Sequence, residues 1–141
     1  MDHRATVRRL FDDVWNGRRF DTIEELYAPD FVADYRPYAP LRHGHDAVRE
    51  MVERAWATMP DYHEELLDVL VDGDRAAVRL RISGTQDGAW GPLPPTGRRL
   101  EFEEILILTF DEHGRVKHQR GIVDNLAALR QAGVMPTPPT E

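Results

Sequence analysis

The sequence predicts an α+β fold: a curved antiparallel or mixed sheet and three N-terminal helices that form a cone-shaped barrel around a deep pocket. Apolar residues recur at helical spacing in residues 1–60. Residues 64–123 contain long segments rich in Val, Ile, Leu and Phe, separated by turn sequences. Helices followed by a meander of strands are typical of α+β domains. A strongly curved sheet with helices across its concave face encloses a pocket.

Three helices are predicted in the N-terminal part, over residues 3–16, 21–27 and 45–59. Asp2 can cap the start of the first helix, and Gly17 can end it. Pro29 closes the second helix and Pro60 stops the third, because proline cannot continue a helix.

The sheet is predicted from one short strand and four longer ones, over residues 31–35, 64–71, 75–85, 100–110 and 115–123. The turn sequences at 72–74 and 112–114 indicate antiparallel hairpins. The Gly- and Pro-containing segment 86–97 is a longer loop. A final short helix over 125–132 ends at Gly133.

Length and composition are those of one globular domain, which we place at residues 1–135. The chain has 141 residues, of which 41% are hydrophobic and 30% charged. The proline-rich segment 136–141 is expected to be a disordered or extended tail. The formal net charge of −7 argues against a nucleic-acid partner, because phosphates require a basic face.

Membrane insertion, secretion and disulfide chemistry are not expected. No apolar run approaches the roughly 20 residues that span a bilayer. Residues 1–13 carry acids and lack the apolar core of a signal peptide. The sequence contains no cysteine, which excludes disulfides, thiolate catalysis and cysteine-ligated zinc. We therefore expect a cytoplasmic protein.

No metal or other cofactor is expected. The six histidines lack a ligand pattern, and the closest pair, His43 and His45, has no nearby acid at a recognised metal spacing. The sequence has neither a phosphate-binding glycine loop nor a Gly-x-Ser-x-Gly elbow.

An ordered series of short motifs resembles one known family. Its most specific member is GPLPPTGRR at 91–99, followed by a strand. The others are YAPDFV at 27–32, His43-Gly44, DGD at 72–74, DEHGRV at 111–116, and Asp124 with the helix LAALRQAG at 126–133. In this order they resemble the SnoaL-like polyketide cyclases of the nuclear-transport-factor-2-like superfamily. The resemblance covers nearly the whole chain.

The resemblance implies that Asp124 is the general acid/base, since the family's cyclases carry a catalytic carboxylate at the end of the last strand. An Asp directly after the apolar Ile122 and Val123, facing a pocket, would be desolvated and its pKa raised. The alternative is that Asp124 caps the helix 125–132, because Asp is among the commonest N-cap residues.

Arg120 and Glu104 are further catalytic candidates, and His118 is a candidate substrate contact. If Asp124 faces inward, strand alternation places Arg120 and His118 on the same side. There Arg120 could stabilise an enolate oxygen, and His118 could contact substrate or relay a proton. The family alignment also places Glu104 on the pocket side, whereas Leu106 stands where another polar residue is common.

The expected pocket wall consists of large aromatic and sulfur-containing side chains. The substrate-contacting candidates are Trp15, Tyr35, Trp56 and Trp90, with Met51 and Met59 beside them. Such residues also dominate ordinary cores. Trp90 differs because its Gly/Pro loop would let it cover the pocket mouth.

The sequence thus predicts a cofactor-free cyclase of a polyketide-type intermediate. An acidic C–H is deprotonated, and the enolate attacks a carbonyl of the same molecule in an aldol-type ring closure. The alternatives are a hydroxylase or an epoxide-opening enzyme of the same pathway type, and a non-catalytic ligand-binding domain. A neighbouring branch of the superfamily hydrolyses epoxides with an Asp-Arg-Asp triad around a water, and the alignment offers Arg81 but only Ser83 and Gly121 at the acidic positions.

The expected partners are a hydrophobic small-molecule substrate and a second copy of the chain. A one-sided sheet leaves an outer face that must be polar or covered. The apolar residues available on several strands of such a face are Leu67, Val69, Ile105 and Ile107. We expect a twofold homodimer.

Overall fold

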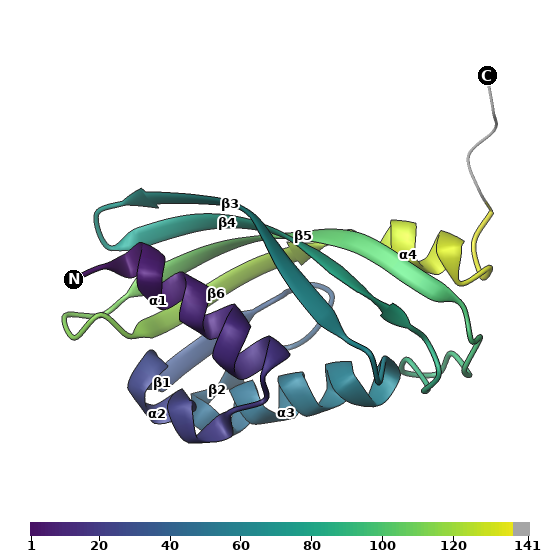
Figure 1. The fold of residues 1–141 in the computed structure, drawn as a ribbon, viewed down its shortest axis with the longest axis horizontal. Helices are drawn as coiled ribbons and strands as arrows, with labels where there is room; N and C mark the ends of the chain where they lie inside the picture. Colours follow the sequence, from purple (N-terminus) through teal and green to yellow (C-terminus); the bar gives the residue numbers. More distant parts are fainter. Residues whose placement is uncertain (137–141) are drawn as a thin grey trace.

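The computed structural model describes residues 1–136, and within them a six-stranded sheet arches over three helical segments (Figure 1). The strands are β1 (Tyr27–Asp34), β2 (Arg42–His43), β3 (His63–Asp72), β4 (Arg75–Thr85), β5 (Arg99–Phe110) and β6 (Val116–Val123). Their spatial order is β2-β1-β6-β5-β4-β3. Only the β1–β6 pairing is parallel, so the sheet is mixed and open. The predicted fold class, a curved sheet with N-terminal helices, is confirmed.

The helices lie close to their predicted ranges. They are α1 (His3–Arg9), the π-helical η1 (Leu10–Asn16), the 3₁₀ turn η2 (Phe20–Thr22), α2 (Ile23–Leu26), α3 (Gly44–Thr58) and α4 (Asn125–Gln131). The predicted helix over 3–16 is therefore one segment whose second half widens to π geometry. Asp2 caps it as expected by accepting a hydrogen bond from the Ala5 amide at 3.0 Å.

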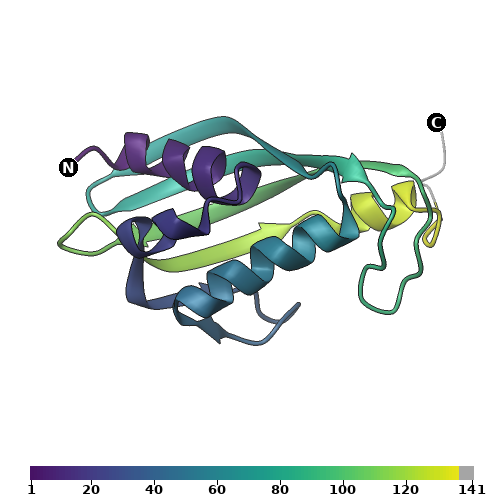
Figure 2. The ribbon, with the colours of Figure 1, turned by 60° about the horizontal axis from the view of Figure 1, so that its bottom comes forward.

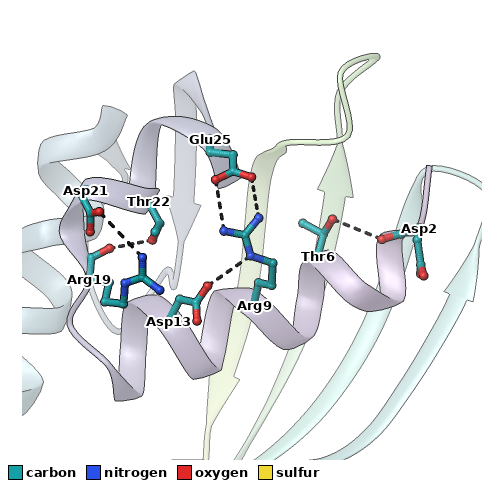
Figure 3. A network of polar contacts seen from close by, with 8 residues as sticks. All are labelled: Asp2, Thr6, Arg9, Asp13, Arg19, Asp21, Thr22 and Glu25. Carbon is teal, nitrogen blue, oxygen red and sulfur yellow. Dashed lines mark hydrogen bonds and ion pairs between the residues drawn. The ribbon is translucent and has the colours of Figure 1, made fainter.

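Side chains tie the first helical segment to the second (Figure 3). The Arg9 guanidinium donates to Asp13 on its own helix at 3.2 Å and to Glu25 on α2 at 3.1 Å. Thr22 donates from its hydroxyl to the Arg19 carbonyl at 2.6 Å, which tightens the turn between the segments. Because the Arg9–Glu25 pair is largely exposed, it orients the segments more than it stabilises them.

The core fills the space between the sheet and the helices. Alternate residues of β4 and β5 point inward and are buried, as the strand period of two requires. Val7, Phe11 and Val14 from the first helical segment and Val48 from α3 pack against them. The inward face is thus apolar apart from a few polar side chains that define the site.

The structure differs from the sequence prediction at the β1 edge. The predicted helix over 21–27 ends at Leu26, and β1 starts at Tyr27 instead of residue 31. The reason is non-local: β1 pairs in parallel with β6, about 90 residues later, and Tyr27 packs edge-on against Phe31 with ring centroids 4.9 Å apart. The two-residue strand β2 was not predicted.

The cone has two distinct ends. The N-terminus and the 111–115 turn lie at one end, whereas α4, the loop 86–98 and the C-terminal half of α3 gather at the other (Figure 2). Gly133, with φ of +83°, follows α4 as predicted. The expected tail lies outside the described residues apart from Pro136. None of the helices in the described part of the chain has the length and apolar character needed to cross a membrane.

Candidate active site

A cavity of about 500 Å³ opens at the end of the cone that carries α4 and the loop 86–98. Its inner wall is largely apolar and aromatic and includes Trp15, Ala33, Ile82 and Phe102. Its mouth is formed by Tyr38, Trp90, Pro92 and Leu93 from loops and Leu129 from α4. An apolar cavity with a few polar groups is the usual form of a small-molecule site.

Glu104 is the acidic side chain of this cavity. It lies at the centre of β5 and is only 6% exposed, with its neighbours Phe102 and Leu106 also directed inward. The Tyr35 hydroxyl donates to Glu104 Oε2 at 2.6 Å, and the Gln119 amide donates to the Tyr35 oxygen at 2.6 Å. The Tyr35 hydroxyl therefore donates its proton to Glu104 and accepts a hydrogen bond from Gln119.

Gly121 makes room for this arrangement. It lies on β6 opposite Leu106 of β5. A Cβ atom at this position would fall into the Tyr35 ring and 2.9 Å from Glu104 Oε2. A glycine within a strand commonly marks such a close approach. The missing side chain is what allows Tyr35 to reach Glu104 across the inner face.

A second tyrosine–carboxyl pair lies in the same region. Tyr62 lines the cavity, and its hydroxyl donates to Glu64 Oε1. Glu64 is 4% exposed, and its other oxygen, Oε2, has no hydrogen-bond partner among the described residues. Asn16 fixes the backbone here by accepting from the Glu64 amide at 2.7 Å and donating to the Glu64 carbonyl at 2.8 Å. Glu64 thus contacts the Tyr62 hydroxyl, and its backbone is held by two hydrogen bonds with Asn16.

Burial controls the protonation of both carboxyls. Desolvation raises the pKa of Glu104 to about 7, although the hydrogen bond from Tyr35 acts in the opposite direction. Burial, and then the charge of Glu104, hold the pKa of Glu64 well above its usual range. Burial and the adjacent carboxylates also raise the pKa of Tyr35 and Tyr62, which remain protonated. Glu104, which lines the cavity, therefore has a pKa close to neutral pH, and Glu64, which is hydrogen-bonded to Tyr62, has a pKa raised in the same direction.

Comparisons with known proteins show which family the chain resembles over its length. The family model for SnoaL-like polyketide cyclases matches residues 5–132. The chain belongs to this family. A search of curated proteins found no significant match.

Several solved structures share the fold of this SnoaL-like protein. A protein from Jannaschia sp. CCS1, assigned as a SnoaL-like polyketide cyclase, superposes with a TM-score of 0.84 at 25% identity, covering 95% of this chain and 93% of that one. IdmH from Streptomyces antibioticus, assigned as a polyketide cyclase, gives 0.83 at 26% identity, covering 95% and 100%. AclR from Streptomyces galilaeus, assigned as a hydroxylase, gives 0.82 at 22% identity over 98% and 85%, which shows the fold alone.

Asp124 does not occupy the position that the sequence predicted for it. Its side chain is exposed and caps α4, accepting a hydrogen bond from the Ala127 amide at 3.1 Å. Its neighbours Val123 and Asn125 line the inner cavity, but Asp124 does not. The expected inward, desolvated orientation is therefore wrong, because the chain turns from strand to helix at this residue and its carboxylate is needed as the cap.

Arg120 and His118 were predicted to point into the pocket on the same side as Asp124, but their face of β6 is the outer one. Arg120 donates to the Asp34 carbonyl at 3.1 Å, and neither residue lines the inner cavity. The inward residues are Gln119 and Gly121, the alternate set. Arg120 and His118 do share one face of β6, as strand alternation requires, but the inward face is that of Gln119 and Gly121.

Three of the four predicted aromatic wall residues, namely Trp15, Tyr35 and Trp90, line the cavity. Trp90 lies at the mouth and donates from its indole to the Tyr38 hydroxyl at 3.3 Å. Trp56 is the exception, since it packs behind the wall, donates to the Trp15 carbonyl at 2.8 Å and carries the Arg18 guanidinium 4.0 Å from its ring.

Sequence reasoning missed Tyr62, Glu64 and Gln119. Glu64 was assigned to a strand, but no sequence signal distinguishes its inward acid from the outward Glu65. The signal that was available for Gln119 is Gly121, whose place within a strand indicates the crowded inner face.

The remaining charged candidates lie away from the cavity. Arg81, considered for epoxide opening, pairs with Glu65 and Glu101 at 3.3 Å each on the outer face of the sheet. Across residues 1–136, no three His, Asp or Glu side chains are grouped closely enough to hold a metal ion.

Proposed function

We propose that this SnoaL-like protein is a cofactor-free cyclase of a hydrophobic, polyketide-type intermediate, with Glu104 as its general acid/base. The single observation that carries the proposal is the buried carboxyl of Glu104 in an apolar cavity, with its pKa raised to about 7 and the Tyr35 hydroxyl on one oxygen. A base whose pKa lies near the working pH combines availability of the ionised form with a strong pull on the proton.

The reaction needs one proton transfer and one new bond. Glu104, ionised, removes a proton from a substrate carbon that lies between carbonyl groups. The resulting enolate carbon attacks a second carbonyl carbon of the same molecule and forms a C–C bond. The electrons of that carbonyl move to its oxygen, which takes the proton back from Glu104. The product is an isomer of the substrate, and the cavity contributes by folding the chain and excluding water.

Tyr35 has a positioning role in this proposal. Its proton is committed to Oε2 of Glu104, and its oxygen is occupied by Gln119. The other carboxylate oxygen, Oε1, has no hydrogen-bond partner among the described residues and remains for the substrate. Tyr35 therefore selects which oxygen of Glu104 acts as the base.

Tyr62 is the proposed hydrogen-bond donor to the enolate oxygen. While Glu64 is protonated, its carboxyl can donate to the Tyr62 oxygen, which frees the Tyr62 proton to point into the cavity. The raised pKa of Glu64 supports this exchange of roles. Two carboxyls whose environments separate their pKa values are a recurring basis for assigning base and acid.

The proposal is tested by exchanging the two candidate acids separately. Purified protein is incubated with a pool of linear polyketide intermediates, binding is followed by native mass spectrometry, and isomers are separated by chromatography. Glu104→Gln should lower kcat by at least roughly 10²-fold, the scale of a lost general base. Asp124→Asn should leave kcat near normal, because Asn also caps helices.

Two results would overturn the proposal. If Asp124→Asn abolished turnover while Glu104→Gln retained it, Asp124 would return as the acid/base. If the wild type bound members of the pool without converting them, the chain would be a ligand-binding domain.

A further inference from the structure

Two arginines line the cavity without a partner in the described part of the chain. Arg42 comes from β2 and is half-buried, and Arg54 comes from α3 and is exposed at the mouth. Neither guanidinium makes an ion pair or a hydrogen bond with another residue of the range 1–136. Nearby Arg36, by contrast, is bound to Asp34 at 3.0 Å.

The fold directs Arg54 toward the cavity. Met51, Arg54, Ala55 and Thr58 recur at spacings of three and four on α3, and all four line the cavity. The stripe is otherwise apolar or small, so the charged member is out of character for a face that covers an apolar cavity.

Arg42 and Arg54 lack an ion-pair partner within residues 1–136, and a shortage of acidic residues is not the reason. The chain has 25 acidic and 18 basic residues, and Arg79 and Arg81 on the outer sheet face each pair with two acids. Among the described residues that line the cavity, the only other charged side chain is Glu104, which is 6% exposed. The acid is thus buried, whereas Arg42 is half-buried and Arg54 is exposed.

We infer that the cavity binds ligands with an apolar body and a carboxylate, and that Arg42 and Arg54 hold this carboxylate at the mouth. The planar guanidinium matches a carboxylate with two parallel hydrogen bonds, and the interaction is stronger beside apolar walls than in water. The inference rests on the proposed function in taking the cavity as the substrate site, and it makes the substrate a polyketide acid whose reactive segment lies near Glu104.

The test uses two probes of the same apolar body, the anionic 2-naphthoate and the neutral 2-naphthamide, with binding at pH 7 followed by calorimetry and by quenching of tryptophan fluorescence. The wild type should bind the carboxylate at least roughly tenfold more tightly than the amide, as expected for a charge-assisted pair. Arg54→Met and the double variant with Arg42→Met should reduce this ratio stepwise toward one, with the amide affinity unchanged. Met suits an exposed helical site, so Arg54→Met should remain folded.

Arg8→Met is the matched control, because Arg8 is also an exposed helical arginine but lies on α1 outside the cavity lining. It should keep the wild-type ratio. Equal affinity of the wild type for the two probes, failure of both to bind, or a ratio that survives in the double variant would overturn the inference. Absence of the proposed catalysis would not overturn the inference. If Glu104→Gln keeps the wild-type ratio of carboxylate to amide affinity, anion binding is independent of turnover.

Discussion

At the scale of single residues, the chemistry of the cavity depends on opposing effects at one carboxyl. Burial raises the pKa of Glu104 to about 7, and the hydrogen bond from Tyr35 limits the rise because it favours the ionised form. Without this hydrogen bond a larger fraction of Glu104 would be protonated at neutral pH. Burial is the larger effect, and the Tyr35 hydroxyl moderates it.

This balance gives a directional prediction for pH dependence. A base must be ionised, so kcat/KM should rise with pH and level off above an inflection near pH 7. Tyr35→Phe removes the hydrogen bond that lowers the pKa, so the inflection should move to higher pH. A ¹³C-NMR titration of the Glu104 carboxyl should show the same displacement without substrate. An inflection that is unchanged or lower in Tyr35→Phe would contradict the assigned role.

The sequence pointed to Glu104 and to Tyr35 as pocket residues, but not to the contact between them or to Gln119, for a physical reason. Alternation shows only that Glu103 and Glu104 point to opposite faces, and the family resemblance is what placed Glu104 on the pocket side. Tyr35 lies 69 residues before Glu104 in sequence, and Gln119 lies 84 residues after Tyr35. Their meeting depends on the parallel β1–β6 pairing, which local pattern does not encode.

At the scale of elements, β6 must lack a side chain at Gly121 so that Tyr35, which follows β1, can contact Glu104 of β5. Gly121→Ala would place a methyl group against the Tyr35 ring and Glu104 Oε2. We expect a loss of about 1–3 kcal/mol in unfolding free energy, the usual cost of overpacking, and a lower kcat because the added methyl group displaces Tyr35 from Glu104. Urea unfolding measures the first effect. Ser83→Ala, at an outward position of β4, is the control and should change stability by no more than about 0.5 kcal/mol.

The junction of β6 and α4 separates the two roles that the sequence left open for Asp124. Asp124→Ala removes the hydrogen bond to the Ala127 amide and should destabilise the protein by about 1 kcal/mol, whereas Asp124→Asn should be near neutral. Both are compared with wild type by urea unfolding. If Asp124→Ala were as stable as wild type, the cap would be dispensable and the position of this carboxylate would need another explanation.

Elements with a strong local signal were predicted well, and those that depend on distant partners were not. The residues 75–85 form β4 as predicted, because their alternation and their turn are local. The start of β1 was not predicted, because it depends on pairing with β6, which is distant in sequence. The strand β2 was not predicted, because it has only two residues.

At the scale of the whole molecule, the outer face of the sheet carries an apolar patch framed by charge. Ile105 and Ile122 are direct cross-strand partners and are 55% and 69% exposed. Ile107 lies beside them, whereas Val69, which the sequence placed in this patch, packs against the core. Arg79 bridges Asp68 and Glu103 on the same face, at 2.6 Å and 2.9 Å.

We expect this patch to bind a second copy of the chain. A twofold axis would bring the isoleucines of both copies together, and the mixed charges around them would meet complementary charges. Ile122→Lys should therefore convert a dimer to a monomer, as measured by light scattering at micromolar concentration. Leu41→Lys, which changes an exposed residue before β2, should leave the dimer intact. A wild type that is monomeric under these conditions would show that the patch serves another purpose. A dimer that persists in Ile122→Lys would place the interface on a different face of the molecule.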